Sequence, residues 1–166
     1  MFSIERCPVP ATTLLDKYLQ NGAYADCYST LVRDKITFPE FIFSFYTTPL
    51  FRLERLILTL LISKPSTDQE ARDMADGVSG TFAAWTVESQ NENEILMCDF
   101  AGRTRSWLMI APMEDHTRLY FGSAVVPSRS ARAGMSTFGF GFQVLLAFHR
   151  IYSVLLLYSA KSNFEQ

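Results

Sequence analysis

His149 is the residue of this sequence whose type and setting best suit acid–base chemistry. It lies within a long apolar run, whereas the other histidine, His116, falls among turn residues where water reaches it. An imidazole titrates near neutral pH, so His149 can serve as a general base or bind a ligand by a hydrogen bond. A histidine with its hydrogen bonds satisfied inside a core is the alternative. No second His, Asp or Glu stands at metal-ligand spacing from either residue, so no metal site is predicted.

Nucleophile motifs are missing from the sequence. Ser106 and Ser123 fall in expected strands but outside any Gly-x-Ser-x-Gly elbow, which argues against a hydrolase triad. Cys7, Cys27 and Cys98 show no metal-ligand spacing, and their odd number argues against a disulfide framework. We expect reduced thiols packed as small apolar groups. The sequence therefore predicts no catalytic set and no cofactor.

Charged residues near one expected turn allow two interpretations. Asp99 and Arg105 flank a hairpin, where they could form an ion pair across the strands. Alternatively, Arg105 could bind the anionic head group of a ligand. Glu54 and Arg55, by contrast, fit a solvated helix face.

Composition excludes several classes of protein. The chain has 166 residues, of which 48% are hydrophobic, and its formal net charge is −2. It is too apolar to be disordered, and its near-neutral charge supplies no patch for nucleic acid. An acid and a proline stand near the N-terminus where a signal peptide needs an apolar run, so a cytoplasmic location is expected. We expect one domain over residues 1–166, with residues 1–22 as an N-terminal extension containing a short helix.

Two consecutive helices are predicted between residues 38 and 62. Thr37 and Glu40 form a capping box at the start of the first helix. Thr48 caps the second, with Pro49 in its first turn. Apolar residues then recur at a helical period and predict a buried face. This stripe consists of Leu50, Leu53, Leu56, Ile57, Leu60 and Leu61. Shorter helices are expected at residues 11–20, with Thr12 or Thr13 as the cap, and at residues 67–76, with Thr67 and Glu70 as a second capping box.

The β-like segments follow one another closely. A first strand is expected at residues 23–32, and four more at 81–88, 94–100, 104–111 and 118–126. Short, turn-rich connections between the last four indicate antiparallel hairpins. For the strand containing Trp107, both faces carry apolar residues, so the sequence leaves open which face turns inward. Helices on one side of an antiparallel sheet define an α+β domain.

The last helix, within residues 135–160, is apolar on more than one side. His149 and Arg150 lie at its centre, where an arginine costs about 2.5–3.5 kcal/mol to insert into a bilayer. A buried helix of a single domain is therefore the interpretation we favour, and a tail anchor is the alternative. The helix must be covered on two sides. The sheet and the helix pair could cover it, or one side could form the wall of a cavity or the seam of a homodimer.

Four segments and this order of elements together resemble a known superfamily. The segments are Tyr24–Tyr28, Phe45–Leu50, Ser106–Leu108 and Thr117–Val125. The chain resembles the helix-grip superfamily over residues 23–160; the superfamily includes START lipid-transfer domains and polyketide-cyclase-like proteins. Within it, the chain is similar to a bacterial family of unknown function whose members are also seen fused to epimerase-like domains. No Gly-rich dinucleotide fingerprint follows any strand, so such a domain is not expected here.

The resemblance implies a curved antiparallel sheet that grips the long C-terminal helix around a cavity for a hydrophobic or amphipathic small molecule. Apolar walls are then expected from Trp85, Trp107, Phe121, Phe148 and Tyr152. His149 and Arg105 are the candidates to orient a polar head group. A cofactor-free cyclase, isomerase or hydrolase with His149 as base is one alternative, and a homodimeric assembly module with a collapsed cavity is another.

Overall fold

The computed structural model describes residues 3–126 and 140–165, but not the side chains of Ile62 and of residues 140–149. Its helices are α1 (Asp16–Gln20), α2 (Phe38–Tyr46), α3 (Pro49–Ile62), α4 (Asp68–Ala75) and α5 (Phe140–Ser162). Its strands are β1 (Glu5–Arg6), β2 (Tyr24–Val32), β3 (Thr81–Phe82), β4 (Trp85–Gln90), β5 (Glu94–Asp99), β6 (Thr104–Pro112) and β7 (Thr117–Val125).

These strands form one open antiparallel sheet in the order β1-β2-β7-β6-β5-β4-β3. The strands from β3 to β7 follow one another as hairpins, as their turn-rich connections predict. The exception is the pairing of β2 with β7, which brings the start of the chain against its late part over nine residue pairs. The α+β class and the antiparallel hairpins are thereby confirmed.

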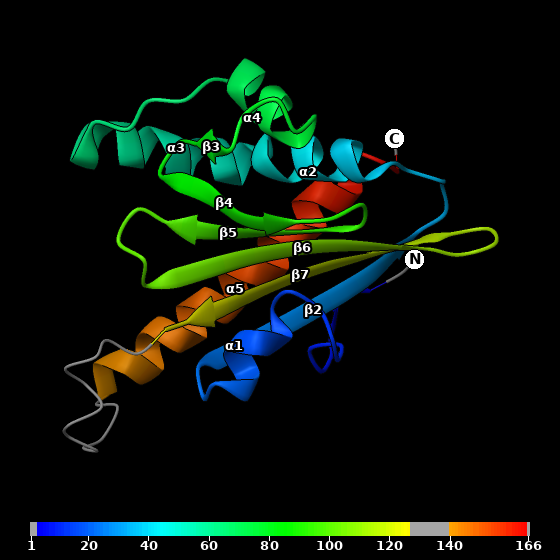
Figure 1. Cartoon of the computed structure of the whole chain (residues 1–166), viewed down its shortest axis with the longest axis horizontal. Helices are drawn as coiled ribbons and strands as arrows, with labels where there is room; N and C mark the ends of the chain where they lie inside the picture. The colour runs from blue at the N-terminus through cyan, green and yellow to red at the C-terminus, as the bar shows by residue number, and fades with distance from the viewer. Residues whose placement is uncertain (1–2, 127–139, 166) are drawn as a thin grey trace.

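The two faces of the sheet have different covers (Figure 1). We call the face packed against α2 and α5 the inner face, and the face packed against α1 and residues 7–15 the outer face. Strand alternation places Tyr28, Leu108 and Phe121 in the inner core, whereas Cys27 and Trp107 belong to a second core on the outer face. A sheet covered on both sides buries both sets of side chains, which is why the strands are apolar on both faces.

Local sequence signals correctly predict where α2, α3 and α4 begin. Thr37 with Glu40, and Thr67 with Glu70, form complete capping boxes at α2 and α4. Thr48 caps α3 by accepting the N–H of Phe51. Each of these motifs spans one helical turn, so the sequence alone contains everything needed to form it.

Two element boundaries differ from the prediction. Thr12 has a φ of 67° and Leu15 is the N-cap, so the first helix begins at Asp16 rather than after Thr12 or Thr13. The strand predicted at residues 81–88 is divided into β3 and β4 by a tight turn at Ala83, where φ is 52°. Non-glycine residues adopt such angles rarely, so neither interruption is visible in the apolar pattern.

Apart from Leu50, which packs against the inner core, the apolar stripe of α3 is exposed, contrary to the prediction of a buried face. Leu53, Leu56, Ile57, Leu60 and Leu61 are between 46% and 77% exposed. The buried side chains are instead Phe51 and Arg55. Arg55 donates to both Ser66 and Asp68, and its guanidinium lies 5.3 Å from the centre of the Phe82 ring. The interpretation of Arg55 as part of a solvated face is therefore wrong, because this arginine anchors the loop before α4.

The end of α5 is attached to α2 by polar contacts. Ser44 donates to the carbonyl of Ala160 at 3.0 Å, and Asn163 donates to Ser44 at 3.0 Å. Leu156, Leu157 and Ala160 complete the inner core beneath this end. In the described part of the chain, no helix has the length and apolarity that crossing a membrane requires.

Candidate functional site

The inner face of the sheet changes from apolar to polar from one row of residues to the next. One row across the strands consists of Ile95, Leu108, Phe121 and Tyr28. The next inward-facing row consists of Met97, Ser106, Ser123 and Asp26. Ser106, Ser123 and Asp26 are at most 7% exposed. Burial of polar groups costs free energy unless they are hydrogen-bonded, so this row demands partners.

Asp26 lies at the β2 end of the polar row. Its Oδ1 accepts a hydrogen bond from the Ser123 hydroxyl at 2.7 Å, and its Oδ2 accepts one from the Tyr24 hydroxyl at 3.3 Å. Arg150, on α5, reaches the Tyr24 hydroxyl at 3.4 Å. The row is thereby connected to the helix that lies over β2 and β7.

Tyr46 extends the polar row toward the helix pair. This fully buried residue ends α2, and its hydroxyl lies 3.4 Å from the Ser106 hydroxyl. Burial raises the pKa of Tyr46, and the negative charge of Glu54 raises it further. Glu54 of α3 is therefore within electrostatic reach of the Tyr46 hydroxyl.

Glu54 joins α3 to α5 by a short hydrogen bond from the Tyr152 hydroxyl. Burial raises the pKa of the Glu54 carboxyl, although the bond from Tyr152 opposes that effect. Burial and the Glu54 charge both raise the pKa of Tyr152. We name Asp26, Tyr46, Glu54, Ser106, Ser123 and Tyr152 the inner polar cluster. It brings together carboxyls and hydroxyls from the sheet and from α2, α3 and α5 that can accept, donate or transfer a proton.

Trp85 lies near this cluster and has an unusual indole. It pairs with Phe82, whose ring is 5.6 Å from that of Tyr46. The Trp85 Nε1 atom is buried and has no hydrogen-bond partner within the described residues. A buried N–H without a partner costs about 1–3 kcal/mol, which makes it a candidate donor to a bound molecule.

Three of the predicted site residues lie on the inner face, and they differ in what they contact. Tyr152 belongs to the inner polar cluster, and Trp85 packs beside the inner core. Phe121 is 5% exposed and its ring lies 4.8 Å from that of Phe45. Phe121 is therefore part of the packed core.

Arg105 and Trp107 lie on the outer face and cannot line a space between the sheet and α5. Trp107 is fully buried and donates its indole N–H to Glu94 at 2.7 Å. Arg105 donates to Glu88 at 2.5 Å and to the Tyr18 hydroxyl at 2.9 Å. Two predictions are therefore wrong: that Trp107 shares a wall with Phe121, and that Arg105 orients a head group in the same cavity. Phe121 lies opposite Leu108, which faces the inner core, whereas Trp107 and Arg105 alternate with Leu108 on β6 and face the other way.

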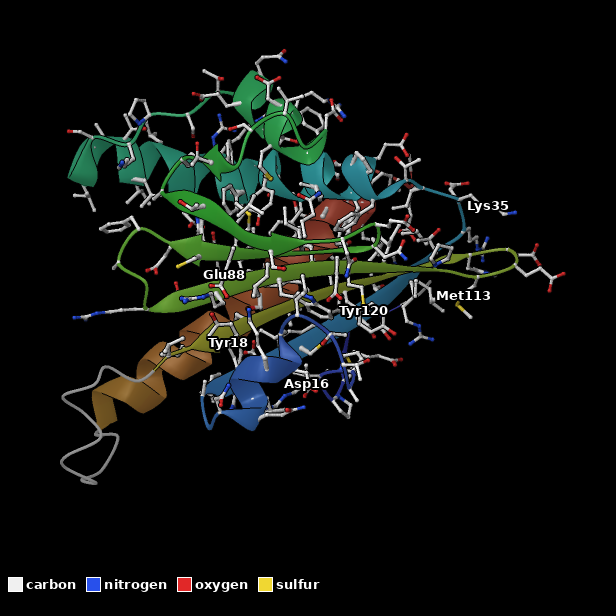
Figure 2. The ribbon with its side chains drawn as sticks, in the orientation of Figure 1. Asp16, Tyr18, Lys35, Glu88, Met113 and Tyr120 are labelled. Atoms are coloured by element: carbon white, nitrogen blue, oxygen red, sulfur yellow. The ribbon has the colours of Figure 1, made fainter. Side chains whose placement is uncertain are left out.

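The outer face instead uses these side chains to hold α1. Tyr18 donates to Glu88 at 2.5 Å, and Lys17 forms an ion pair with the same carboxylate at 2.8 Å. Tyr18 and Glu88 meet over the sheet on the side of α1 (Figure 2). Arg105 also lies over the Tyr18 ring at 4.9 Å. Because these groups satisfy one another, Arg105 is engaged in fixing α1.

Phe148 and His149 belong to the first part of α5, and their side chains lie outside the described residues. Their expected roles remain predictions.

Sequence reasoning misses Asp26, Tyr46 and Glu54. A signal for Asp26 exists, since it alternates with Tyr24 and Tyr28 on one strand and so shares their face. No sequence signal points to Glu54, because the apolar stripe of α3 predicts that the opposite side of this helix is buried.

One open hollow, with a volume of about 320 Å³, lies away from this cluster, between α2, α4 and the end of the chain. Phe43, Arg72 and Phe164 are among its lining residues, and Arg72 stacks on the Phe43 ring at 3.6 Å.

The described residues contain no group of His, Cys, Asp and Glu side chains that could hold a metal ion. Comparisons with models of known protein families, with curated proteins and with solved structures return no match.

Proposed function

We propose that this chain binds a small amphipathic molecule between the inner face of the sheet and α5, in the manner of a helix-grip protein. The apolar part of the ligand would lie against the apolar end of this face. Its polar head would contact the inner polar cluster. The observation that carries the proposal is the buried polar row of Asp26, Ser123 and Ser106 beneath α5 and α2, where apolar side chains would pack at lower cost.

Two further features support a polar ligand head at this place. Trp85 offers beside the cluster an indole N–H that has no partner among the residues that the structure describes. Glu54 has a raised pKa because of its burial, so its carboxyl can carry a proton at a higher pH than an exposed one. Together they give the cluster both donors and acceptors, which is typical of sites that orient an otherwise apolar ligand.

A second candidate is catalysis in the same place. A carboxyl with a raised pKa next to two tyrosine hydroxyls, those of Tyr46 and Tyr152, is suited to moving a proton next to a carbonyl group. In this version Glu54 is the acid–base group and a tyrosine donates to the substrate oxygen. Turnover that is lost in Glu54→Gln while binding is retained would favour the enzyme over the binder.

Native mass spectrometry of the purified, never-denatured chain tests the proposed binding. We expect a population that carries a small non-covalent adduct, released by organic solvent. Ser106→Leu places an apolar side chain into the polar row and should abolish the adduct. Thr86→Leu also replaces a hydroxyl side chain by leucine, but at an exposed strand position, and should retain the adduct. An adduct that survives Ser106→Leu would place the ligand elsewhere.

A further inference from the structure

Cys7 and Cys27 lie side by side although twenty residues separate them in sequence. Their sulfur atoms are 3.3 Å apart, and the backbone N–H of Cys7 donates to the carbonyl of Cys27 at 3.0 Å. This pairing continues the register in which Arg6 lies opposite Tyr28. Directly opposite residues in antiparallel strands have Cα atoms about 4.5–5.5 Å apart, within the range that a disulfide bridges.

The two thiols differ in exposure and in acidity. Cys7 is partly exposed, whereas Cys27 is 1% exposed and belongs to the outer core. The hydrogen bond with Cys27, with help from Ser29 and from the charge of Arg118, lowers the pKa of the Cys7 thiol to about 7. The bond to Cys7 and burial raise the pKa of Cys27. Burial, and more weakly the charge of Glu5, act against the Cys7 thiolate, but together they do not outweigh these groups.

We propose that Cys7 and Cys27 are a peroxide-responsive dithiol that closes to an intramolecular disulfide. The Cys7 thiolate attacks one oxygen of a peroxide, the O–O bond breaks, and the other oxygen leaves with a proton as water or an alcohol. Cys7 is then a sulfenic acid. The Cys27 sulfur attacks it and loses its proton, the S–O bond breaks, and water leaves. Two thiols are oxidised and one peroxide is reduced, so the electrons balance.

Closure would fasten the N-terminal segment to the sheet. Cys7 and Val9 of this segment pack against the outer core around Trp107, together with Leu15 at its end. In the reduced state the segment is held to β2 by the short β1 pairing and by contacts such as that from Thr30 to the carbonyl of Ser3. A covalent bond at Cys7 makes this cover permanent until a dithiol reductant opens it.

Hydrogen peroxide is the probe that tests this inference. The wild-type chain is treated with equimolar peroxide and digested without reduction, and the peptides are mapped by mass spectrometry. We expect one product, a peptide pair joined by Cys7 and Cys27, lighter by two hydrogen atoms than the separate peptides. Cys98→Ser is the matched control and should give the same product in the same yield. Dithiothreitol should restore both thiols.

The order of the steps has its own readout. In Cys27→Ser, the sulfenic acid at Cys7 has no resolving thiol, so dimedone should label Cys7 at least ten times more than Cys98. The proposal is overturned if wild-type Cys7 and Cys27 stay reduced while free cysteine in the same tube is oxidised. It is equally overturned if the disulfide formed involves Cys98 or joins two chains. Because the peptide map uses the unmodified chain, a variant that folds poorly does not affect this test.

Discussion

One carboxylate oxygen of Glu94 accepts two hydrogen bonds, from the indole N–H of Trp107 at 2.7 Å and from the backbone N–H of Leu14 at 2.9 Å. The other oxygen accepts from Asn91 at 2.9 Å. This buried carboxylate therefore connects the sheet to the segment that covers its outer face. It explains why Trp107 is a structural residue of that face.

Removal of the Glu94 charge should lower the stability of the fold, because its hydrogen bonds hold the cover of the outer face to the sheet. Glu94→Gln replaces one acceptor oxygen by an NH₂ group, which must then face a donor. We expect a loss of about 1–3 kcal/mol in the free energy of unfolding, measured in urea. Glu92→Gln, at an exposed position two residues away, is the control and should change stability by less than about 0.5 kcal/mol. Equal effects of the two variants would show that the Glu94 contacts contribute nothing specific.

Gly122 should tolerate no side chain. A Cβ atom there would lie 2.6 Å from Leu15 Cδ2 and 2.9 Å from the carbonyl oxygen of Asp26. Gly122→Ala should therefore destabilise the fold by about 1–3 kcal/mol, because Leu15 must leave its place over the sheet. Gly80→Ala is the matched control, since nothing lies within 4 Å of the new methyl group and its φ is not positive. Thermal unfolding of both variants distinguishes a local clash from a general effect of alanine.

Alkylation rates should separate the three thiols by pH. The Cys7 pKa of about 7 predicts that iodoacetamide modifies Cys7 with half of its maximal rate near pH 7. Burial raises the pKa of Cys98, so its rate of modification should rise at a higher pH than that of an ordinary thiol. Site-resolved mass spectrometry over pH 5–10 measures both. A shared pH profile for Cys7 and Cys98 would contradict the acidity assigned to Cys7.

Glu54 should make the fold less stable as the pH rises. Its folded-state pKa lies above the ordinary value of 4.5, so folding favours the protonated carboxyl. The stability that this proton contributes is complete below pH 4.5 and is lost as the pH rises through the folded-state pKa. Glu54→Gln keeps an acceptor for Tyr152 without titrating. The variant and the wild type should have similar stability at pH 4, and the variant should be the more stable of the two at pH 8. The opposite ranking at pH 8 would show that the Glu54 charge is stabilised where it lies.

How much of this fold the sequence alone predicts depends on how far apart in the chain the interacting residues lie. The capping boxes at Thr37 and Thr67, and the hairpins from residue 81 onward, are local, and their prediction is confirmed. The sequence leaves the facing of Trp107 open, since Leu108 beside it is equally apolar and both faces of the sheet are covered. The cover over Trp107 comes from residues 7–15, whose amino acids carry no strong pattern.

The candidate site is predictable only in part for a similar reason. Tyr152 and Trp85 lie near the inner polar cluster, as a site between the sheet and the last helix requires. Glu54 enters this cluster because Phe51 and Arg55 turn α3 so that its leucine stripe faces outward. The apolar stripe predicts the reverse, and only the packing of Arg55 against Phe82 and Asp68 decides between the two orientations.

The two tryptophans allow the most direct test of binding at the inner polar cluster. The Trp85 indole N–H is without a partner among the described residues of the inner face, and the Trp107 indole N–H is bound to Glu94 on the outer face. In a ¹⁵N-labelled chain, Trp85→Phe and Trp107→Phe assign the two indole signals. Titration with dodecanoate and with 8-anilinonaphthalene-1-sulfonate should move the Trp85 signal and leave the Trp107 signal in place. Movement of the Trp107 signal alone, or of neither signal with either probe, would contradict a ligand site between the sheet and α5.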